Sequence, residues 1–324
     1  MSLRTYYIFS HGTLSRKENT LLFESSEGKK FIPVETIDQI YIFGEVSLNT
    51  KLLSFASSKG IMIHFFNYYG FYVGSFYPKE VGLSGDLTVK QVEHYLDSNK
   101  RLELAKCFVE GAVHNLKRNL QKREGFEEVI RTIERYEKNI KDADSITNLM
   151  SVEAHCKKAY FSTFDRITGW SFEKRTIQPP DNPLNALISF GNSLVYTMIL
   201  KEIYLTPLNP TISYLHEPSQ RRFSLSLDIS EIFKPVLVDR LIFHLINNGI
   251  INETHFENHL KGVYLNEEGR KIFVSKFEER INQTVLHRKL KRKIKYRTLI
   301  RLELYKLIKH LLGEKKYQPL KVWW

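Results

Sequence analysis

The stretch Phe71-Tyr-Val-Gly-Ser-Phe-Tyr-Pro-Lys-Glu-Val-Gly-Leu-Ser-Gly85 decides the fold, because two hydrophobic periods meet in it. Before it, β-branched and aromatic residues gather in short runs between turn residues, which is typical of β-strands. From Leu87 onward, apolar residues recur at intervals of three and four positions, which is typical of amphipathic helices. Pro78 and two glycines separate the two patterns. The sequence therefore predicts a domain boundary within 78–85.

This division predicts an α+β protein, with a small β-rich domain over 1–80 and a larger all-helical domain over 81–324. The expected strands lie near 5–9, 20–23, 30–34, 39–43, 61–66 and 71–77. A turn is expected at 15–19 and a single helix at 50–58. The expected helices of the second domain lie near 88–122, 125–141, 145–166, 183–204, 228–248 and 268–312, the last broken near 282–286.

Composition narrows the class of protein. Hydrophobic residues make up 42% of the 324 residues, which is enough for a sizeable core and excludes a disordered chain. No unbroken apolar run reaches the roughly 18 residues that span a bilayer, and the N-terminus lacks the apolar segment of a signal peptide. The two cysteines form no CxxC motif. We therefore expect a reduced, cytoplasmic protein.

The net charge of +12 is concentrated at one end of the chain. Residues 1–80 hold 8 basic and 7 acidic side chains, and 81–286 hold 27 of each. Residues 287–324 hold 13 basic and 2 acidic side chains, a net of +11. Such a block indicates a surface for a polyanion or an anionic membrane, and a solvated helix face is the alternative.

Several common catalytic motifs are absent from the sequence. It contains no GxxxxGK[ST], no GxGxxG after an expected strand and no GxSxG. Nucleotide-driven motors, Rossmann dehydrogenases and α/β-hydrolases are therefore disfavoured.

Two places combine residues that could carry chemistry. In the Pro-rich loop and the helix that follows it, His216 precedes Asp228 and Glu231, which are spaced i and i+3 and so share a helix face. Their alternative role is helix capping, with Asp228 as N-cap and Glu231 in the first turn. Glu153 lies within a partly apolar helical stripe and needs a partner, either a metal ion or Lys157 one turn later.

The order and spacing of several segments resemble one known family, over essentially the whole chain. They are Tyr41-Ile-Phe-Gly-Glu-Val-Ser-Leu48, Lys59-Gly-Ile-Met-Ile-His-Phe-Phe66, Glu153-Ala-x-x-x-x-Ala-Tyr-Phe161, Asn185-Ala-Leu-Ile-Ser-Phe-Gly-Asn-Ser-Leu194, Leu215-His216 and Ser224-Leu-Ser-Leu-Asp-Ile-Ser-Glu-Ile-Phe-Lys-Pro235. Together they resemble the CRISPR-associated spacer-acquisition integrase, the universal adaptation nuclease of CRISPR systems.

The resemblance implies a reaction and a set of site residues. By this resemblance, the metal-binding residues of the family correspond to Glu153, His216 and Glu231, and a further functional acidic residue corresponds to Asp228. The implied reaction joins a DNA 3′-hydroxyl to a phosphodiester of a CRISPR repeat, and the same site nicks DNA. Two carboxylates and one imidazole favour Mg²⁺ or Mn²⁺ over zinc. A departure from many relatives is Lys234, which stands where they carry arginine.

The resemblance also implies an assembly. It predicts a homodimer built through the β-rich domain, two of which flank a small dimeric adaptation partner in a heterohexamer on double-stranded and branched DNA. Basic residues that flank the predicted ligands in sequence are candidate phosphate contacts: Lys157, Lys158, Arg166, Lys174, Arg175, Arg221 and Arg222. The alternative function is a non-catalytic helical DNA-binding protein, in which the acidic residues only stabilise helices.

Overall fold

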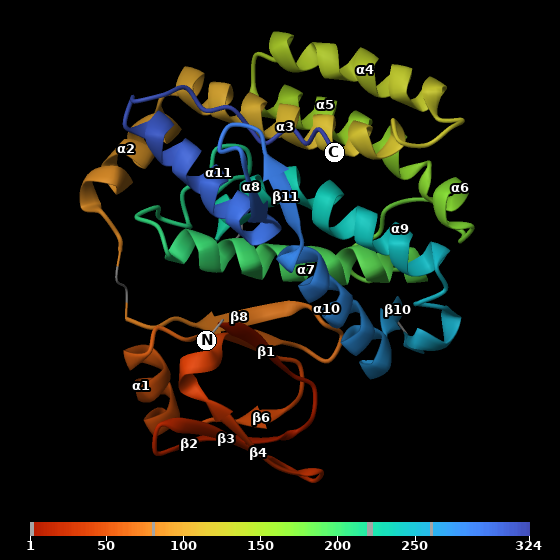
Figure 1. Cartoon of the computed structure of the whole chain (residues 1–324). Coiled ribbons are helices and arrows are strands. Elements are labelled where there is room, and N and C mark those ends of the chain that lie inside the picture. Colours follow the sequence, from red (N-terminus) through yellow and green to blue (C-terminus); the bar gives the residue numbers. More distant parts are fainter. Residues whose placement is uncertain (1–2, 80–81, 219–222, 260–261) are drawn as a thin grey trace. The chain divides into compact units, whose positions relative to one another are not determined.

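The computed structural model describes residues 3–79, 82–218, 223–259 and 262–324. The chain forms two compact units, Met1–Val81 and Gly82–Trp324. Strands dominate the first unit and helices the second, so the expected α+β class is confirmed (Figure 1). Each unit is described by itself below.

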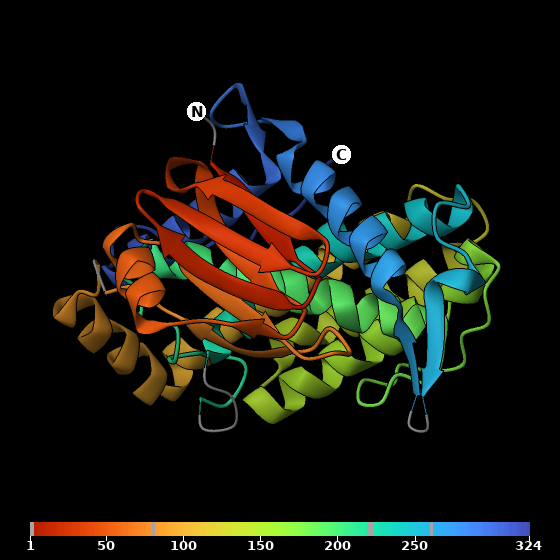
Figure 2. The same ribbon diagram turned by 90° about the horizontal axis from the view of Figure 1, so that it is seen from below.

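Over residues 3–79 the first unit contains two four-stranded sheets and one α-helix. One sheet has the order β1-β5-β7-β8 and the other β4-β3-β2-β6. In the first sheet β1, β5 and β7 are parallel and β8 is antiparallel. Figure 2 shows the strands from below, in red and orange. The strands are β1 (Arg4–Ile8), β2 (Gly12–Lys17), β3 (Thr20–Ser25), β4 (Gly28–Pro33), β5 (Ile37–Ile42), β6 (Val46–Ser47), β7 (Met62–Phe66) and β8 (Tyr72–Phe76), with a short 3₁₀ turn at Val34–Thr36.

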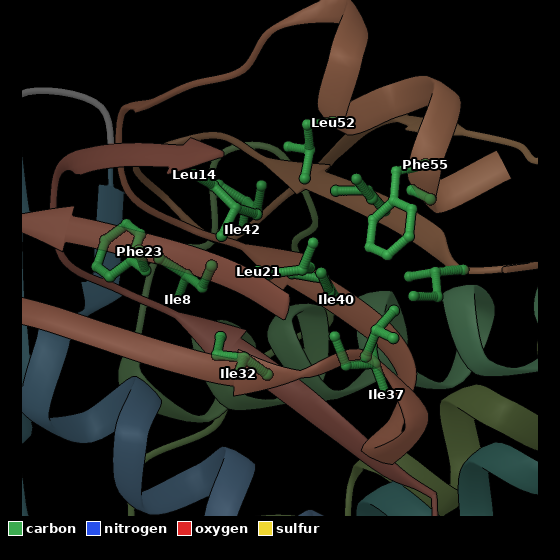
Figure 3. Packing of buried hydrophobic residues seen from close by; sticks show 14 residues of the cluster. Ile8, Leu14, Leu21, Phe23, Ile32, Ile37, Ile40, Ile42, Leu52 and Phe55 are labelled. Carbon is green, nitrogen blue, oxygen red and sulfur yellow. The ribbon is translucent and has the colours of Figure 1, made fainter. Parts of the chain in front are cut away.

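The core of this unit lies between the sheets and α1 (Thr50–Ser58). Asn49 is the N-cap of α1, and its side chain accepts a hydrogen bond from the Leu52 N–H. Side chains from both sheets and from α1 meet there, as Figure 3 shows. The predicted turn at 15–19 is partly wrong, because β2 continues to Lys17 and only Glu18 and Asn19 turn the chain. Glu18 adopts a φ of 54°, a conformation that a two-residue hairpin turn requires.

A buried histidine joins two strands of the first sheet. His64 lies 2.6 Å through Nδ1 from Oγ of Ser75 and 3.2 Å through Nε2 from Oε1 of Gln39. Its side chain is completely buried, and this burial lowers the pKa of His64 to about 3. The imidazole is therefore neutral in the folded protein at ordinary pH.

The second unit contains ten α-helices among its described residues. They are α2 (Gly85–Leu96), α3 (Ser98–Leu120), α4 (Glu127–Asp142), α5 (Ile146–Phe161), α6 (Phe164–Thr168), α7 (Pro183–Tyr204), α8 (Ser224–Lys234), α9 (Arg240–Asn247), α10 (Glu267–Asn282) and α11 (Tyr296–Leu311). The predicted helix 88–122 is two helices, because Asp97 accepts hydrogen bonds from the N–H groups of Asn99 and Lys100 and starts α3 there.

The central helix of this unit is α7, which has the predicted bounds and is buried along most of its length. It is also the one helix of the described residues that is long and apolar enough to cross a membrane. Within its apolar window 78% of the residues are buried inside the protein. A core helix of a folded unit has the same property.

Three more expected helices differ from the structure. The helix predicted at 145–166 is broken at Ser162 and Thr163 into α5 and α6. The helix predicted at 228–248 begins earlier, at Ser224, and is interrupted by a π-helical turn at Pro235–Asp239 before α9. The helix predicted at 268–312 is replaced in its middle by a hairpin of β11 (Thr284–His287) and β12 (Arg292–Lys295). A 3₁₀ turn (Glu253–His255) and a further hairpin of β9 (Phe256–His259) and β10 (Gly262–Leu265) were not predicted.

Residues 317–324 pack along α3 as an extended tail. Asn115 of α3 donates through Nδ2 to the carbonyl of Leu320 (3.0 Å) and accepts from the N–H of Val322 (2.9 Å). The buried carboxylate of Glu303 accepts from the hydroxyl of Tyr317 at 2.5 Å and from the N–H of Leu320 at 3.0 Å. The tail is therefore part of the packed structure.

Candidate active site

Glu153 lies in the middle of α5, inside the helical unit. Ser145 begins this helix by accepting a hydrogen bond from the N–H of Asn148 (3.3 Å). Two turns later, Glu153 is only 6% exposed. Lys157, at i+4, brings its Nζ within 2.9 Å of Glu153 Oε1. The lysine that the sequence offered as an alternative partner is thus in contact with this carboxylate.

Lys157 is shared with a second buried carboxylate, Glu231 of α8. Its Nζ lies 2.7 Å from Glu231 Oε2, while Lys234 lies 2.5 Å from Oε1. Burial opposes ionisation of Glu231, but the two ammonium groups outweigh it and hold the pKa of this carboxyl well below its usual range. Burial likewise opposes the charge of Lys157, yet Glu153 and Glu231 raise the pKa of its ammonium. This arrangement links α5 to α8 through one cation.

Asp228 organises the loop that carries His216. Its buried carboxylate accepts hydrogen bonds from the N–H groups of Tyr214 (2.7 Å), Leu215 (3.0 Å) and His216 (3.0 Å). Because α8 begins at Ser224, Asp228 lies a full turn inside the helix, and the interpretation of Asp228 as an N-cap is wrong. Glu231 is correspondingly in the second turn, not the first. Asp228 accepts hydrogen bonds from N–H groups of the preceding loop and not from those of its own helix.

The imidazole of His216 is oriented by the same aspartate. His216 Nδ1 lies 2.8 Å from Asp228 Oδ1. Burial lowers the pKa of His216, but the hydrogen bond and the charge of Asp228 outweigh this effect and raise it. With Nδ1 engaged, Nε2 is the ring nitrogen that remains for a ligand.

A pocket of about 490 Å³ is lined by Lys157, His216, Glu231 and Lys234, whereas Glu153 and Asp228 are not on its wall. The charged side chains on its wall carry both signs and come from α5, α8, the π-helical turn, the His216 loop and the segment before α7; they are Lys157, Arg175, His216, Glu217, Glu231, Lys234 and Asp239. Aliphatic and aromatic side chains complete the wall. A polar pocket of this kind is a suitable place for a phosphodiester and an oxygen-ligated cation.

The predicted metal ligands are brought near one another, but they do not form a preformed metal cage. No group of three His, Cys, Asp or Glu side chains in the described part of the chain is close enough to hold an ion. Glu153 and Glu231 instead share Lys157. Glu153 Oε1 is buried without a well-aligned hydrogen bond, although Lys157 Nζ is near it. By its chemistry the donor set fits a hard divalent cation, with an ammonium group now lying between the two carboxylates.

The predicted phosphate contacts fall into two groups. Lys157 and Arg175 are on the pocket wall. Arg175 is fixed there by donating to Asn185 Oδ1 and Ser189 Oγ, both at 3.0 Å, and its burial lowers the pKa of the guanidinium to about 10.

The others lie away from the pocket wall or cannot be placed. Lys158 and Lys174 are exposed. Arg166 donates to the carbonyl of Gly125 (2.8 Å) and packs over the ring of Phe126 at 4.6 Å, so its role is structural in this arrangement. Arg221 and Arg222 lie outside the described residues.

Asp239 is a pocket residue that the sequence did not reveal. It ends the π-helical turn and is hydrogen-bonded to Tyr160. Burial raises the pKa of Asp239 to about 7, against the opposing effects of Tyr160, Lys234 and Arg175. The only sequence signal was Pro235 inside a helical pattern, which is where a helix departs from regular geometry.

Known proteins are similar to this chain in sequence and in fold. The family model described as CRISPR associated protein Cas1 matches residues 6–279. A curated relative from Moorella thermoacetica, named CRISPR-associated endonuclease Cas1 2, is 60% identical over 322 residues, which cover 99% of this chain and 100% of the relative. The solved structure of a CAS1 protein from Thermotoga maritima is 44% identical, covers 98% of this chain and 100% of its own, and superposes with a TM-score of 0.90.

A more distant structure shows how widely the fold is used. A casposase bound to integration product is 19% identical, covers 99% of this chain and 93% of its own, and has a TM-score of 0.84. The family resemblance inferred from the sequence segments is confirmed by the nearer matches. This chain belongs to the Cas1 family of CRISPR-associated proteins.

Proposed function

We propose that this protein is a divalent-metal-dependent DNA endonuclease and integrase, which inserts short DNA fragments into a CRISPR repeat array. The observation that carries the proposal is the sharing of one cation, Lys157, by two buried carboxylates from different helices, Glu153 and Glu231; Lys157 and Glu231 lie on the wall of a charged pocket. The 60% identical relative is named an endonuclease, which supports the same reaction class. The reaction is a displacement at phosphorus by a DNA 3′-hydroxyl or by water.

Glu153, His216 and Glu231 would hold Mn²⁺ or Mg²⁺. When bound, such an ion polarises the phosphoryl oxygen, favours deprotonation of the attacking oxygen and neutralises the leaving oxygen. The protein residues do the remaining work. Asp228 fixes the loop of His216 through three N–H groups and keeps Nδ1 engaged.

The cationic side chains of the pocket would orient the DNA backbone. Lys157, Arg175 and Lys234 present positive charge on the same pocket wall as the carboxylates. Lys157 has two roles in this proposal. Without the metal ion it neutralises Glu153 and Glu231, and when the ion lies between these carboxylates Lys157 would contact a phosphate instead. Electrostatic positioning of this kind is the main protein contribution in phosphoryl transfer.

We further propose the assembly that the family resemblance implies. Two chains would pair through the β-rich unit, and two such dimers would flank a small dimeric adaptation partner, with double-stranded or branched DNA bound across the assembly. The protein would act in the cytoplasm. Size-exclusion chromatography with light scattering, alone and with the partner, tests this; a strictly monomeric chain at micromolar concentration would contradict the dimer.

The decisive experiment measures DNA cleavage and strand joining with Mn²⁺, with Mg²⁺ and with a chelator. Activity should appear with the ions, disappear with chelator, and be lost in Glu153→Ala, His216→Ala and Glu231→Ala. Asp228→Ala should be equally or slightly less impaired. Glu128→Ala, which changes an exposed carboxylate of α4, is the matched control and should remain active.

The same variants separate this proposal from its alternative, a DNA-binding protein without catalysis. A folded Glu153→Ala protein that still cleaves and joins DNA would overturn the metal assignment. A wild-type protein that binds DNA but shows no metal-dependent reaction would favour the non-catalytic alternative.

A further inference from the structure

Five cationic side chains gather where the end of α3 meets α9, α10 and Trp323–Trp324. This basic cluster consists of Arg118, Lys122, Arg123, Arg240 and Arg280. None of the five is on the wall of the pocket. The excess positive charge of the sequence lies in 287–324, whereas all five residues of the basic cluster lie in 81–286, a segment with no net charge. Counting charges along the sequence therefore did not reveal the cluster.

The arginines of the basic cluster are held in place by neutral acceptors. Asn119 accepts from Arg240 Nε through Oδ1 at 2.6 Å and from Arg123 through its main-chain oxygen at 2.5 Å. Arg280 donates to the carbonyl of Val236 at 3.1 Å. These bonds fix the positions of the charges without neutralising them.

The tail supplies two more neutral acceptors. Arg118 donates to the main-chain oxygen of Trp323 at 3.0 Å, and Arg240 donates to that of Trp324 at 3.2 Å. The buried Nε atoms of Arg118 and Arg280 have no hydrogen-bond partner among the described residues. The guanidinium groups are therefore organised but incompletely satisfied.

Like charges dominate the electrostatics of this surface. Lys122 is exposed, and its pKa is lowered first by partial desolvation and then by the four arginines of the cluster. The four arginines are the largest electrostatic contributions to that shift, and none of the five cations forms an ion pair with a carboxylate among the ion pairs found in the described residues. Lys157 in the pocket is the opposite case, because two carboxylates raise its pKa. Repulsion among five cations that lack an internal anion is relieved when an external anion binds.

An aromatic platform borders the basic cluster. The rings of Trp323 and Trp324 meet edge to face at 4.5 Å, and Trp324 Nε1 donates to the hydroxyl of Tyr296 at 2.8 Å. Arg288, in the turn of the β11–β12 hairpin, packs over Trp323 at 4.8 Å. The platform joins the cluster to the basic hairpin, so the positive surface extends beyond one small-anion site.

We propose that the basic cluster binds the phosphate backbone of DNA, as a contact surface separate from the pocket. This inference rests on the proposed function, because that function supplies DNA as the polyanion. Fixed guanidinium forks spread over three helices suit successive phosphates better than one isolated anion. Such contacts position the DNA and do not read its sequence.

The test is fluorescence anisotropy of the full chain with a labelled DNA duplex that carries single-stranded 3′ overhangs. It is performed in chelator, so that no metal-dependent step contributes. Lys122→Glu should weaken binding about tenfold or more near physiological salt. The slope of log affinity against log salt should become shallower by about 0.9 for each lost duplex phosphate contact. Lys138→Glu, an exposed lysine of α4, makes the same change outside the cluster and should have much less effect.

A second variant tests whether the effect of Lys122→Glu comes from the loss of positive charge or only from the carboxylate that it introduces. The double variant Arg118→Gln with Lys122→Gln should also lower both affinity and salt slope. If both cluster variants bind with the affinity and slope of Lys138→Glu, or if the wild-type chain does not bind the duplex, the proposal is wrong. Wild-type binding that depends on the cluster, without any metal-dependent cleavage in the separate assay, would overturn the proposed function alone.

Discussion

The shared lysine of the pocket allows a quantitative test of how the site is held together. In Lys157→Met the side-chain volume is largely kept, but Glu153 loses the one cation that contacts it among the described residues. Glu231 keeps Lys234 at 2.5 Å. The loss therefore falls mainly on Glu153, which is 6% exposed.

The expected cost follows from this geometry. Removing one partner of a buried ion pair typically costs about 3–5 kcal/mol. The Lys157 side chain is 31% exposed, so water partly screens the pair and the lower end of that range applies, about 3 kcal/mol. Glu231, whose pKa is lowered in the folded protein, contributes stability that is present above the unfolded pKa of a glutamate and is lost as pH falls through the folded value. Lys157 causes part of this lowering, so the share of the Lys157→Met deficit that comes from Glu231 should shrink below about pH 4.5, the usual pKa of a glutamate.

The measurement is urea unfolding followed by tryptophan fluorescence, in chelator, at neutral and acidic pH. The three tryptophans, Trp170, Trp323 and Trp324, all belong to the helical unit and so report on it alone. Lys158→Met changes the exposed neighbour on the same helix and should remain within about 0.5 kcal/mol of wild type. If Lys157→Met is as stable as Lys158→Met at neutral pH, or if its deficit does not change with pH, the electrostatic reasoning is wrong.

Two further predictions use buried titratable groups. Asp239, whose pKa rises to about 7 on burial, binds a proton more tightly in the folded state than in the unfolded state, so it lowers stability as pH rises. Asp239→Asn should therefore stabilise the helical unit more at pH 8 than at pH 5, by about 3 kcal/mol in urea unfolding; an equal gain at both values would refute this. His64, whose pKa falls to about 3, contributes stability that is present above about 6.5 and is lost as pH decreases. Amide hydrogen exchange of β7 and β8, corrected for intrinsic rates, should show about 3 kcal/mol less protection at pH 4.5 than at pH 7, and His64→Asn should reduce that difference.

The broad architecture could be predicted because periodicity changes at one place in the sequence. The boundary near 78–85 and the bounds of α7 followed from apolar spacing and from the proline at the start of that helix. The hairpin at 284–295 was missed because each of its strands has only four residues and neither Thr284-Val-Leu-His287 nor Arg292-Lys-Ile-Lys295 gives a clear alternating pattern. A short strand pairs with its neighbour through the main chain, and side-chain periodicity reports this weakly.

The site residues were predictable in kind but not in arrangement. Glu153, His216 and Glu231 came from the family resemblance, and the sequence could not show that Lys157 lies between two of them. The start of α8 was placed too late because its N-cap, Phe223, makes no side-chain capping hydrogen bond, whereas Asp228 is a residue type that favours the N-cap position. The basic cluster could not be predicted, since Arg118, Lys122 and Arg123 are separated from Arg240 and Arg280 by more than a hundred residues and meet them only in the folded unit.

The packing of the tail on α3 has a consequence for how the protein is made. Asn115 finds its partners 205 and 207 positions later, at Leu320 and Val322. At a synthesis rate of about 5–20 residues per second, this amide waits about 10–40 s for its partners to be translated. Until then Asn115 can form only its donor bond to the carbonyl of Ile232 (2.9 Å), and its Oδ1 lacks the N–H of Val322. The helical unit therefore completes its packing only after residues 320–322 have been synthesised, and a ribosome that stalls before them leaves this face of α3 uncovered.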